Sequence, residues 1–163
     1  AGRVHFVAGV KLTENDLTRL GLDVVKTIPI NPCTADRKAL SCVVKTLKSG
    51  QSVHIFPEGT RSRKGSMLKG KKGILLISKL SGRPIVPIGL EGTEKLMPIN
   101  DEDMGKEKFY HAKVKVTIGE SFYLTGQEPD EDKSSYEERA LDFVMNSIAS
   151  LLSPAYRGVY AGK

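Results

Sequence analysis

The sequence has few cysteines and no long apolar run, and each absence excludes a class of protein. The longest uninterrupted apolar run lies at residues 74–77, far short of the roughly 20 residues that a membrane-spanning helix needs. We therefore expect no transmembrane segment. The two cysteines, Cys33 and Cys42, match no metal-ligand spacing and are too few for a disulfide scaffold. We expect no metal site and two reduced thiols, with Cys42 packed as a small apolar residue on a helix.

The chain also lacks an amino-terminal signal pattern, an internal repeat and a low-complexity tract. Its 163 residues suit one domain with its own core. Apolar residues make up 39% and charged residues 27%, which is ordinary globular usage. We predict a single domain over residues 1–163 in a cytoplasmic setting.

The positive charge of the chain is concentrated in one segment. The formal net charge is +6, and residues 57–72 hold six cationic residues against the single acid Glu58. Such a patch suits nucleic acid or an anionic membrane surface. The segment has no aromatic residue on which a base could stack, and it matches no nucleic-acid-binding module. We therefore predict no nucleic-acid partner and a peripheral contact with an anionic membrane.

Hydrophobic periodicity predicts strands that alternate with helices. The strand-like stretches are residues 3–8, 23–30, 52–56, 85–90 and 113–118, and the helix-like stretches are 13–20, 35–49, 71–81 and 134–153. This order predicts an α/β fold with a mixed, mostly parallel sheet flanked by helices.

Two of these helices carry more detailed predictions. The third helix is expected to bury a face made of Ile74, Leu75, Ile77 and Leu80. In the last one, two serines each stand three residues before a glutamate, Ser134 with Glu137 and Ser135 with Glu138. This spacing predicts a double capping box at the start of that helix.

The segment FPEGTRS, residues 56–62, follows a predicted strand and has the residue types of a phosphate site. Gly59 permits close approach of the backbone to an anion, and Thr60 can donate a hydroxyl hydrogen bond. The planar guanidinium of Arg61 matches phosphate oxygens bidentately. Glu58 could orient a cation or a substrate hydroxyl. Each residue alone fits a solvated loop, but the combination favours a phosphorylated ligand.

Arg37 and Lys72 are further candidates for the phosphate site. Arg37 lies near the expected start of a helix, where the macrodipole disfavours a cation, so an anionic ligand is one explanation for it. The other explanation is that Asp36 offsets its charge. Lys72, like Lys69 and Lys71, could bind phosphate, contact anionic lipid head groups or face solvent.

Residues 65–72 nearly match the phosphate-binding loop of nucleotide-binding proteins, G-x-x-x-x-G-K-[ST]. Lys72 stands where the motif needs the hydroxyl that ligates magnesium, and the glycines do not follow directly on a strand. A nucleotide site is therefore the weaker interpretation.

The FPEGTRS block resembles the signature of the glycerolipid acyltransferases, the lysophosphatidic acid acyltransferases in particular. Two further blocks follow the family's order, Asp36-Arg37 upstream and the apolar-proline block of residues 83–88 downstream. The resemblance implies a glycerol-phosphate acyltransferase-like fold. It implies that the glycerol phosphate is surrounded by Arg37, Glu58, Gly59 and Arg61, and that the acyl-donor side is shaped by Pro87 and Ile88.

The resemblance also implies the reaction. It is the transfer of a fatty acyl group from coenzyme A or acyl carrier protein to the 2-hydroxyl of 1-acylglycerol 3-phosphate, that is, lysophosphatidic acid, in phospholipid biosynthesis. No metal or redox cofactor is implied. The enzyme would act as a peripheral protein on the cytoplasmic face of the membrane.

The H-x-x-x-x-D box of this family, whose histidine acts as general base, has no match. The residues five positions after His5, His54 and His111 are Val10, Gly59 and Val116. We expect the chain to begin after the box, and we name no catalytic residue. His54 lies close to the FPEGTRS block, but no carboxylate is spaced to orient it, so we expect a structural histidine. A catalytically inactive module that binds phospholipid or acyl carrier stays an alternative.

Overall fold

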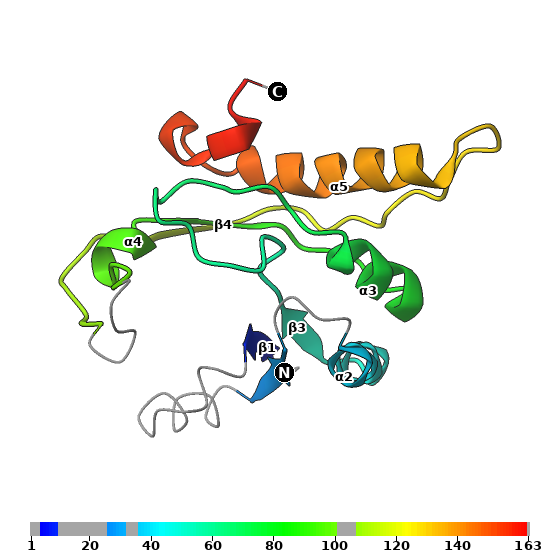
Figure 1. Ribbon diagram of the computed structural model, residues 1–163, viewed down its shortest axis with the longest axis horizontal. Coiled ribbons are helices and arrows are strands. Elements are labelled where there is room, and N and C mark those ends of the chain that lie inside the picture. The colour runs from blue at the N-terminus through cyan, green and yellow to red at the C-terminus, as the bar shows by residue number, and fades with distance from the viewer. Residues whose placement is uncertain (1–3, 10–25, 32–35, 101–106, 163) are drawn as a thin grey trace. The chain divides into compact units, whose positions relative to one another are not determined.

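The computed structural model describes residues 4–9, 26–31, 36–100 and 107–162, and the chain divides into two compact units (Figure 1). Unit 1 consists of Ala1–Gly59 and Gly73–Arg83, and unit 2 consists of Thr60–Lys72 and Pro84–Lys163. The chain thus passes from one unit to the other three times. The division falls within the FPEGTRS block, between Gly59 and Thr60.

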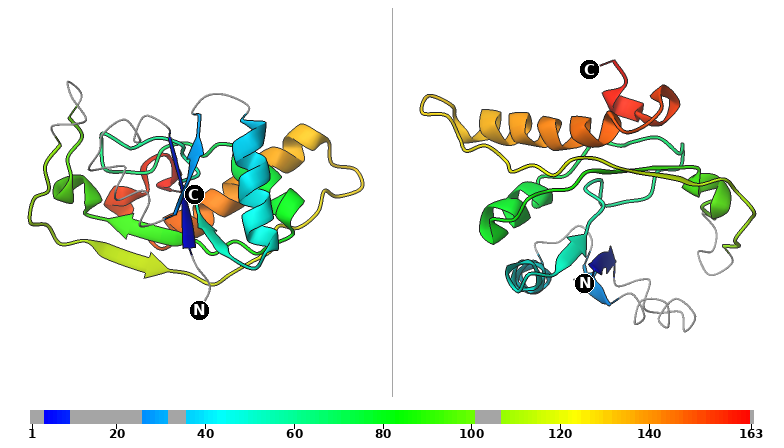
Figure 2. Two further views of the ribbon diagram at one scale, coloured as in Figure 1. Left: turned by 90° about the horizontal axis from the view of Figure 1, so that it is seen from below. Right: turned by 180° about the vertical axis from the view of Figure 1, so that it is seen from behind.

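Unit 1 is built on a three-stranded parallel sheet. Its strands are β1 (Val4–Gly9), β2 (Thr27–Ile30) and β3 (Ser52–His54), in the order β2-β1-β3. Parallel neighbours need a crossover connection, and a helix, α2 (Arg37–Lys48), lies between β2 and β3 in the sequence (Figure 2). The helix predicted at residues 13–20 lies outside the described residues.

Helix α2 forms where the periodicity predicts it. Asp36 is its N-cap, and the Asp36 carboxylate accepts a hydrogen bond from the backbone N–H of Ala39 at 2.9 Å. Ala39 and Val43, four residues apart, are buried at 5% and 2% exposure where the helix packs on β2, β3 and α3. The helix ends at Lys48, close to Gly50, whose φ of +82° suits glycine.

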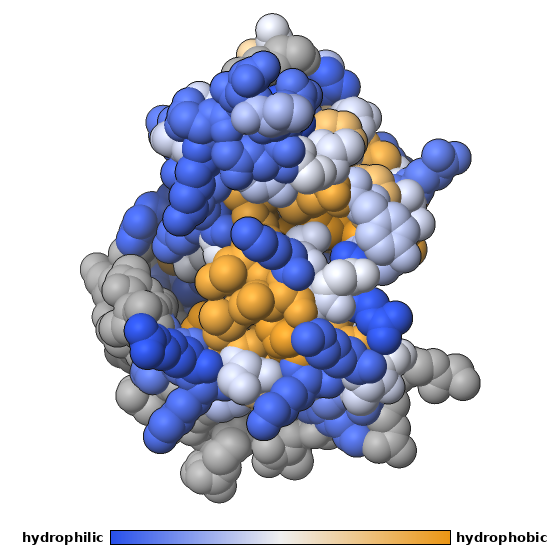
Figure 3. Space-filling view, turned by 90° about the vertical axis from the view of Figure 1, so that its right-hand side faces the viewer, coloured by the Kyte–Doolittle hydropathy of each residue, from blue (hydrophilic) through white to orange (hydrophobic). Residues whose placement is uncertain are grey.

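Helix α3 (Gly73–Ser81) completes unit 1, but its buried face is narrower than predicted. Leu75 is buried, whereas Leu80 is 44% exposed, so the prediction for Leu80 is wrong. Leu76, which lies one turn before Leu80, is 46% exposed as well. Only the side of α3 that carries Leu75 is covered. Figure 3 shows the side of the molecule on which α3 lies in Figure 1. Apolar residues are exposed there beside hydrophilic ones.

Unit 2 contains a two-stranded antiparallel ladder covered on one face. Strands β4 (Ile88–Glu91) and β5 (Lys115–Ile118) pair with Ile88 opposite Ile118. Helix α5 (Lys133–Ala149) and the turn after it cover the face that carries Gly89, where a Cβ would lie 2.9 Å from a methyl carbon of Leu152 (Figure 1). The most buried side chains of the unit are Val144 and Met145, at 1% and 0% exposure. A short helix, α4 (Thr93–Leu96), follows β4.

Helix α5 is capped by a residue that the sequence pattern did not single out. The carboxylate of Asp132 accepts hydrogen bonds from the N–H groups of Ser134 and Ser135 at 2.8 and 3.1 Å. The predicted double capping box is therefore wrong. Aspartate is among the best N-cap residues, and its position places both serines inside the first turn. Glu137 makes an ion pair with Lys72.

The carboxy-terminal segment holds the loop of residues 60–72. It forms two short 3-10 helices, η3 (Pro154–Tyr156) and η4 (Gly158–Tyr160), which we call the C-terminal clasp. Met67 donates its N–H to the carbonyl of Tyr156 at 2.9 Å and accepts one from Val159 at 3.4 Å. The N–H of Gly70 donates to the Tyr160 hydroxyl at 3.1 Å. Met67 and Tyr160 are buried, so the loop is fixed at its centre.

Together the described elements confirm the predicted α/β fold class, with a parallel sheet flanked by helices. The described strands form two sheets, one in each unit. The extent of the single domain stays a prediction.

Candidate functional site

The FPEGTRS block forms a turn that requires its glycine. The carbonyl of Phe56 accepts a hydrogen bond from the N–H of Gly59 at 3.0 Å, and Gly59 has φ +67°. That conformation is strained for any residue with a Cβ. Glu58 is half-buried, and Thr60 is exposed. The predicted turn is confirmed, while the roles of these residues toward phosphate stay predictions.

Arg61 is held by an acid that sequence reasoning missed. Its Nη1 donates to the Glu107 carboxylate at 2.7 Å, and the two side chains are 42% and 8% exposed. The second oxygen of Glu107 accepts the backbone N–H of Asn100 at 3.1 Å. The Arg61 guanidinium and this N–H hold the pKa of Glu107 below its usual range, against the opposing effect of burial. Glu107 lies 46 residues after Arg61, and no spacing rule links the two.

Lys72 is also paired within unit 2. Its Nζ lies 2.7 Å from a carboxylate oxygen of Glu137, and the two side chains are 51% and 26% exposed. The hydrogen bond lowers the pKa of Glu137 and raises that of Lys72. A phosphate would have to share Lys72 with Glu137, so its place in a binding site stays a prediction.

Arg37 begins helix α2 and is exposed to solvent. The Asp36 carboxylate accepts backbone N–H groups from Ala39 at 2.9 Å and from Asn31 at 3.1 Å, which lowers the Asp36 pKa. Among the ion pairs of the described residues, none joins Asp36 to Arg37. Asp36 thus serves mainly as a helix cap, and the Arg37 guanidinium remains accessible to an anion.

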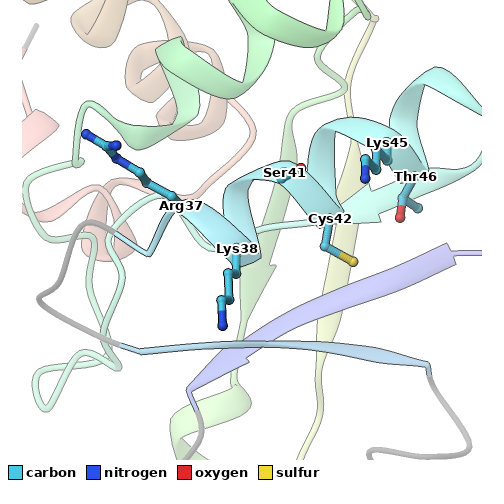
Figure 4. Close-up of a pocket in the computed structure, with 6 residues that line it drawn as sticks. All are labelled: Arg37, Lys38, Ser41, Cys42, Lys45 and Thr46. Atoms are coloured by element: carbon cyan, nitrogen blue, oxygen red, sulfur yellow. The ribbon is translucent and has the colours of Figure 1, made fainter.

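One face of α2 lines an open surface pocket (Figure 4). The side chains that line it are those of Arg37, Lys38, Ser41, Cys42, Lys45 and Thr46. Figure 4 shows Arg37 extending from the amino end of the helix, away from Lys38 and Cys42. Cys42 lies on a helix as predicted, but it is a free, exposed thiol, so the prediction that it packs as a small apolar residue is wrong. The adjacent Val43 takes the buried position instead.

The histidines of unit 1 are held by packing and by an amide. The ring of His54 lies 5.1 Å from that of Phe6 and meets Phe56 edge-to-face at 4.8 Å. This confirms that His54 shares a face with Phe56. Burial lowers the pKa of His54. A ring nitrogen of His5 lies 2.6 Å from the side-chain oxygen of Gln51. These contacts favour structural roles for both rings.

The geometry around Gly70 argues against the nucleotide-binding alternative. Its backbone N–H, which a phosphate-binding loop would offer to a ligand, is taken by the Tyr160 hydroxyl. A Cβ on Gly70 would lie 2.6 Å from the sulfur of Met145, so the glycine is needed for close packing in the core.

The two residues predicted on the acyl-donor side lie at the start of the β4–β5 ladder: Ile88 is the first residue of β4, and Pro87 directly precedes it. Pro87 is buried, and its carbonyl accepts the N–H of Gly119 at 2.9 Å. Ile88 pairs with Ile118, which is 68% exposed. Two residues along β5, Val116 is 58% exposed and shares the face of Ile118. That face is apolar and open, and its role toward an acyl group stays a prediction.

Comparison with known proteins places the chain among enzymes of one class. Residues 1–91, more than half of the sequence, match the family model described as Acyltransferase. The chain belongs to the acyltransferase family. A chloroplastic 1-acyl-sn-glycerol-3-phosphate acyltransferase of Brassica napus is 39% identical over 90 residues, which cover 53% of this chain and 25% of that protein. The 1-acyl-sn-glycerol-3-phosphate acyltransferase of Bacillus subtilis (strain 168) is 28% identical over 121 residues, which cover 74% and 55%.

A solved structure shares the fold. The crystal structure of the 1-acyl-sn-glycerophosphate (LPA) acyltransferase PlsC from Thermotoga maritima aligns with a TM-score of 0.62 at 24% identity. The alignment covers 92% of this chain and 56% of that one. The chain therefore spans between about a quarter and just over half of the length of these relatives.

The helices in the described part of this acyltransferase-family chain are all too short or too polar to cross a bilayer.

Proposed function

We propose that this chain is the glycerophosphate-binding part of an enzyme that acylates the 2-hydroxyl of 1-acylglycerol 3-phosphate. The observation that carries the proposal is the turn at Gly59, followed by a half-exposed Arg61 guanidinium. Backbone N–H groups at such a turn and a planar cation together suit a phosphate monoester. The relatives in Brassica napus and Bacillus subtilis are named for acylation of this class of substrate.

In the proposed reaction, the substrate hydroxyl attacks the carbonyl carbon of an acyl thioester. An ester bond forms, the carbon–sulfur bond breaks, the hydroxyl proton passes to a general base and the thiol leaves. The residues of this chain supply binding energy that positions the hydroxyl. Because the thioester is already activated, the reaction needs no metal or redox cofactor. Coenzyme A and acyl carrier protein both provide a thiol of the required kind.

The proposed donor side is the open face of the β4–β5 ladder. Ile88 lies on that face, opposite the exposed Ile118. An apolar strand surface of this kind suits the hydrocarbon part of an acyl thioester. Pro87, immediately before β4, holds the start of the ladder through its hydrogen bond from Gly119.

We further propose peripheral contact with an anionic membrane surface on the cytoplasmic side. The basic segment 57–72 supplies the charge. Phe56, which directly precedes this segment in the sequence, is 54% exposed and can enter the headgroup region. Both substrates of the proposed reaction carry fatty acyl chains, which a membrane surface would present.

The alternative is a module of the same fold that binds phospholipid or acyl carrier without turnover. It is favoured by the environment of His54, which packs between aromatic rings and has a lowered pKa. The release of free thiol from an acyl thioester in the presence of lysophosphatidate separates the two functions. Turnover by this chain would exclude the alternative.

The first test measures the binding of sn-glycerol 3-phosphate to the full chain by NMR titration. Glycerol serves as the uncharged comparison. We expect Arg61→Ala to weaken glycerol 3-phosphate binding about 10-fold, the typical loss of a charge-assisted pair. Binding of an acyl thioester should change less. The matched control is Arg139→Ala, because Arg139 is also paired with a glutamate at 2.7 Å and is 40% exposed. An equal loss in both variants would overturn the proposal.

A further inference from the structure

The Glu107 carboxylate is fixed independently of its contact with Arg61. It is 8% exposed and accepts the Asn100 N–H at 3.1 Å. The segment that carries it is tied to α4 by the hydrogen bond from the N–H of Tyr110 to the carbonyl of Leu96 at 2.8 Å. Glu107 is therefore an acceptor with a largely buried side chain and a hydrogen bond of its own, against which the longer Arg61 side chain can be oriented.

Arg61 uses one end of its guanidinium for this contact. Nη1 donates to Glu107 at 2.7 Å, while Nη2 and Nε have no partner among the described residues. A guanidinium has five N–H donors in a fixed planar fork, so holding one nitrogen limits the directions in which the others point. A surface arginine that is not held in this way loses rotamer freedom when it binds a ligand, and this loss of entropy weakens binding.

We propose that Glu107 is a positioning residue for anion binding: it holds Arg61 so that the rest of the guanidinium is presented to the phosphate of the acceptor. This inference rests on the proposed function, because it assumes that Arg61 binds the glycerol phosphate. Glu107 itself does not touch the ligand. Its role is to reduce the ordering that Arg61 must undergo on binding.

The geometry of Glu107 and its charge have opposite effects on an anion. The negative charge near Arg61 repels phosphate, whereas the hydrogen bond orients the guanidinium. Two substitutions separate these effects. Glu107→Gln keeps an acceptor oxygen at the same reach and removes the charge. Glu107→Asp keeps the charge and shortens the side chain by one methylene, so that the contact with Arg61 is lost or lengthened.

The experiment measures the dissociation constant for sn-glycerol 3-phosphate in the full chain. We expect Glu107→Asp to weaken binding by about 3- to 10-fold and Glu107→Gln to leave it within about 3-fold of the parent or tighten it. In the Arg61→Ala background, Glu107→Asp should have no further effect, because Glu107 acts only through Arg61. Glu131→Ala is the matched control, since that acid is also paired with an arginine at 2.7 Å and is 13% exposed.

The outcomes separate this inference from the proposed function. If the parent chain binds glycerol 3-phosphate and Arg61→Ala weakens binding about 10-fold, but Glu107→Asp binds as the parent does, the positioning role is overturned and the proposed function stands. If Glu107→Asp weakens binding equally in the Arg61→Ala background, the role of Glu107 is only structural. If Arg61→Ala binds as tightly as the parent, the proposed function itself fails. Thermal unfolding of each variant confirms that binding is measured on folded protein.

Discussion

His54 illustrates how a residue beside a candidate site can be structural. His54 is the last residue of β3, its ring shares a face with that of Phe56 two residues later, and the surrounding rings remove it partly from water. Because burial disfavours the charged form, its pKa lies below the ordinary value of 6.5. The folded state thus favours the neutral ring. The contribution of His54 to stability is complete above the unfolded pKa and is lost as the pH falls below it.

An NMR titration of the His54 ring protons tests this assignment. We expect the midpoint to lie below the midpoint of the same ring in the unfolded chain. A catalytic histidine oriented by a carboxylate would be stabilised as the cation and would titrate at a higher pH instead. A midpoint above 6.5 would therefore contradict the structural role.

At the scale of single residues, the role of a residue was predictable where the backbone conformation alone determines which residue type can stand there. Gly59 is an example, because a sharp turn with positive φ restricts the residue type. Side-chain partners over long separations were not predictable. Glu107 reaches Arg61 across 46 residues, and the sequence shows it only as one acid in a polar connection. Asp132 displaced the predicted caps because several residues near a helix start can compete for the same N–H groups.

Among the elements, the C-terminal clasp has the most direct consequence for the candidate site. It holds the loop that continues from Arg61, through the backbone of Met67 and the N–H of Gly70. Gly158 is required within it, since φ is +54° and a Cβ would lie 2.0 Å from the carbonyl oxygen of Met67. The stability of this loop therefore depends on residues almost at the end of the described chain.

Tyr160→Phe tests the clasp with the smallest possible change. It removes the hydroxyl that accepts the Gly70 N–H and leaves a buried donor unpaired. We expect a loss of about 1–3 kcal/mol in the free energy of unfolding, measured by urea denaturation, with faster hydrogen exchange at the Gly70 amide. The control is Tyr136→Phe, whose hydroxyl donates to the exposed carbonyl of Thr125 and should contribute little. Similar losses in both variants would show that the buried hydrogen bond of Tyr160 contributes no more to stability than the exposed one of Tyr136.

The helices were predictable and the sheet arrangement was less so. Periodicity located α2, α3 and α5 because a buried stripe repeats within one element. The separation of β4 and β5 from the parallel sheet depends on pairing between distant strands, which no local pattern encodes. Leu80 was misplaced for a related reason, since periodicity identifies an apolar face but not what covers it.

For the molecule as a whole, acidic side chains make stability depend on pH. Glu107, Glu131 and Glu137 each have a lowered pKa because a cationic partner donates a hydrogen bond. Asp36 and Asp132 have lowered pKa values because they cap helices or accept nearby hydroxyl and amide donors. All of these groups bind fewer protons in the folded state than in the unfolded chain.

The contribution of these carboxylates to the free energy of unfolding should therefore be nearly constant from pH 7 to about pH 5, a range in which His54 adds a small decrease, and should fall as the pH is lowered further. The stabilisation by these carboxylates is complete above their unfolded pKa values and is lost as each becomes protonated in the folded state. Urea denaturation at several pH values between 7 and 3 measures the effect. A stability that rises on acidification would show that repulsion among the carboxylates outweighs their pairing.

The path of the chain between the two units limits how the protein can be divided. Because the backbone changes unit after Gly59, after Lys72 and after Arg83, no single proteolytic cut and no deletion from one terminus can yield one complete unit without residues of the other. An isolated second unit would need Lys72 joined to Pro84 by a new peptide linker. A fragment designed to contain one unit must therefore join the two separate segments of the chain that form it.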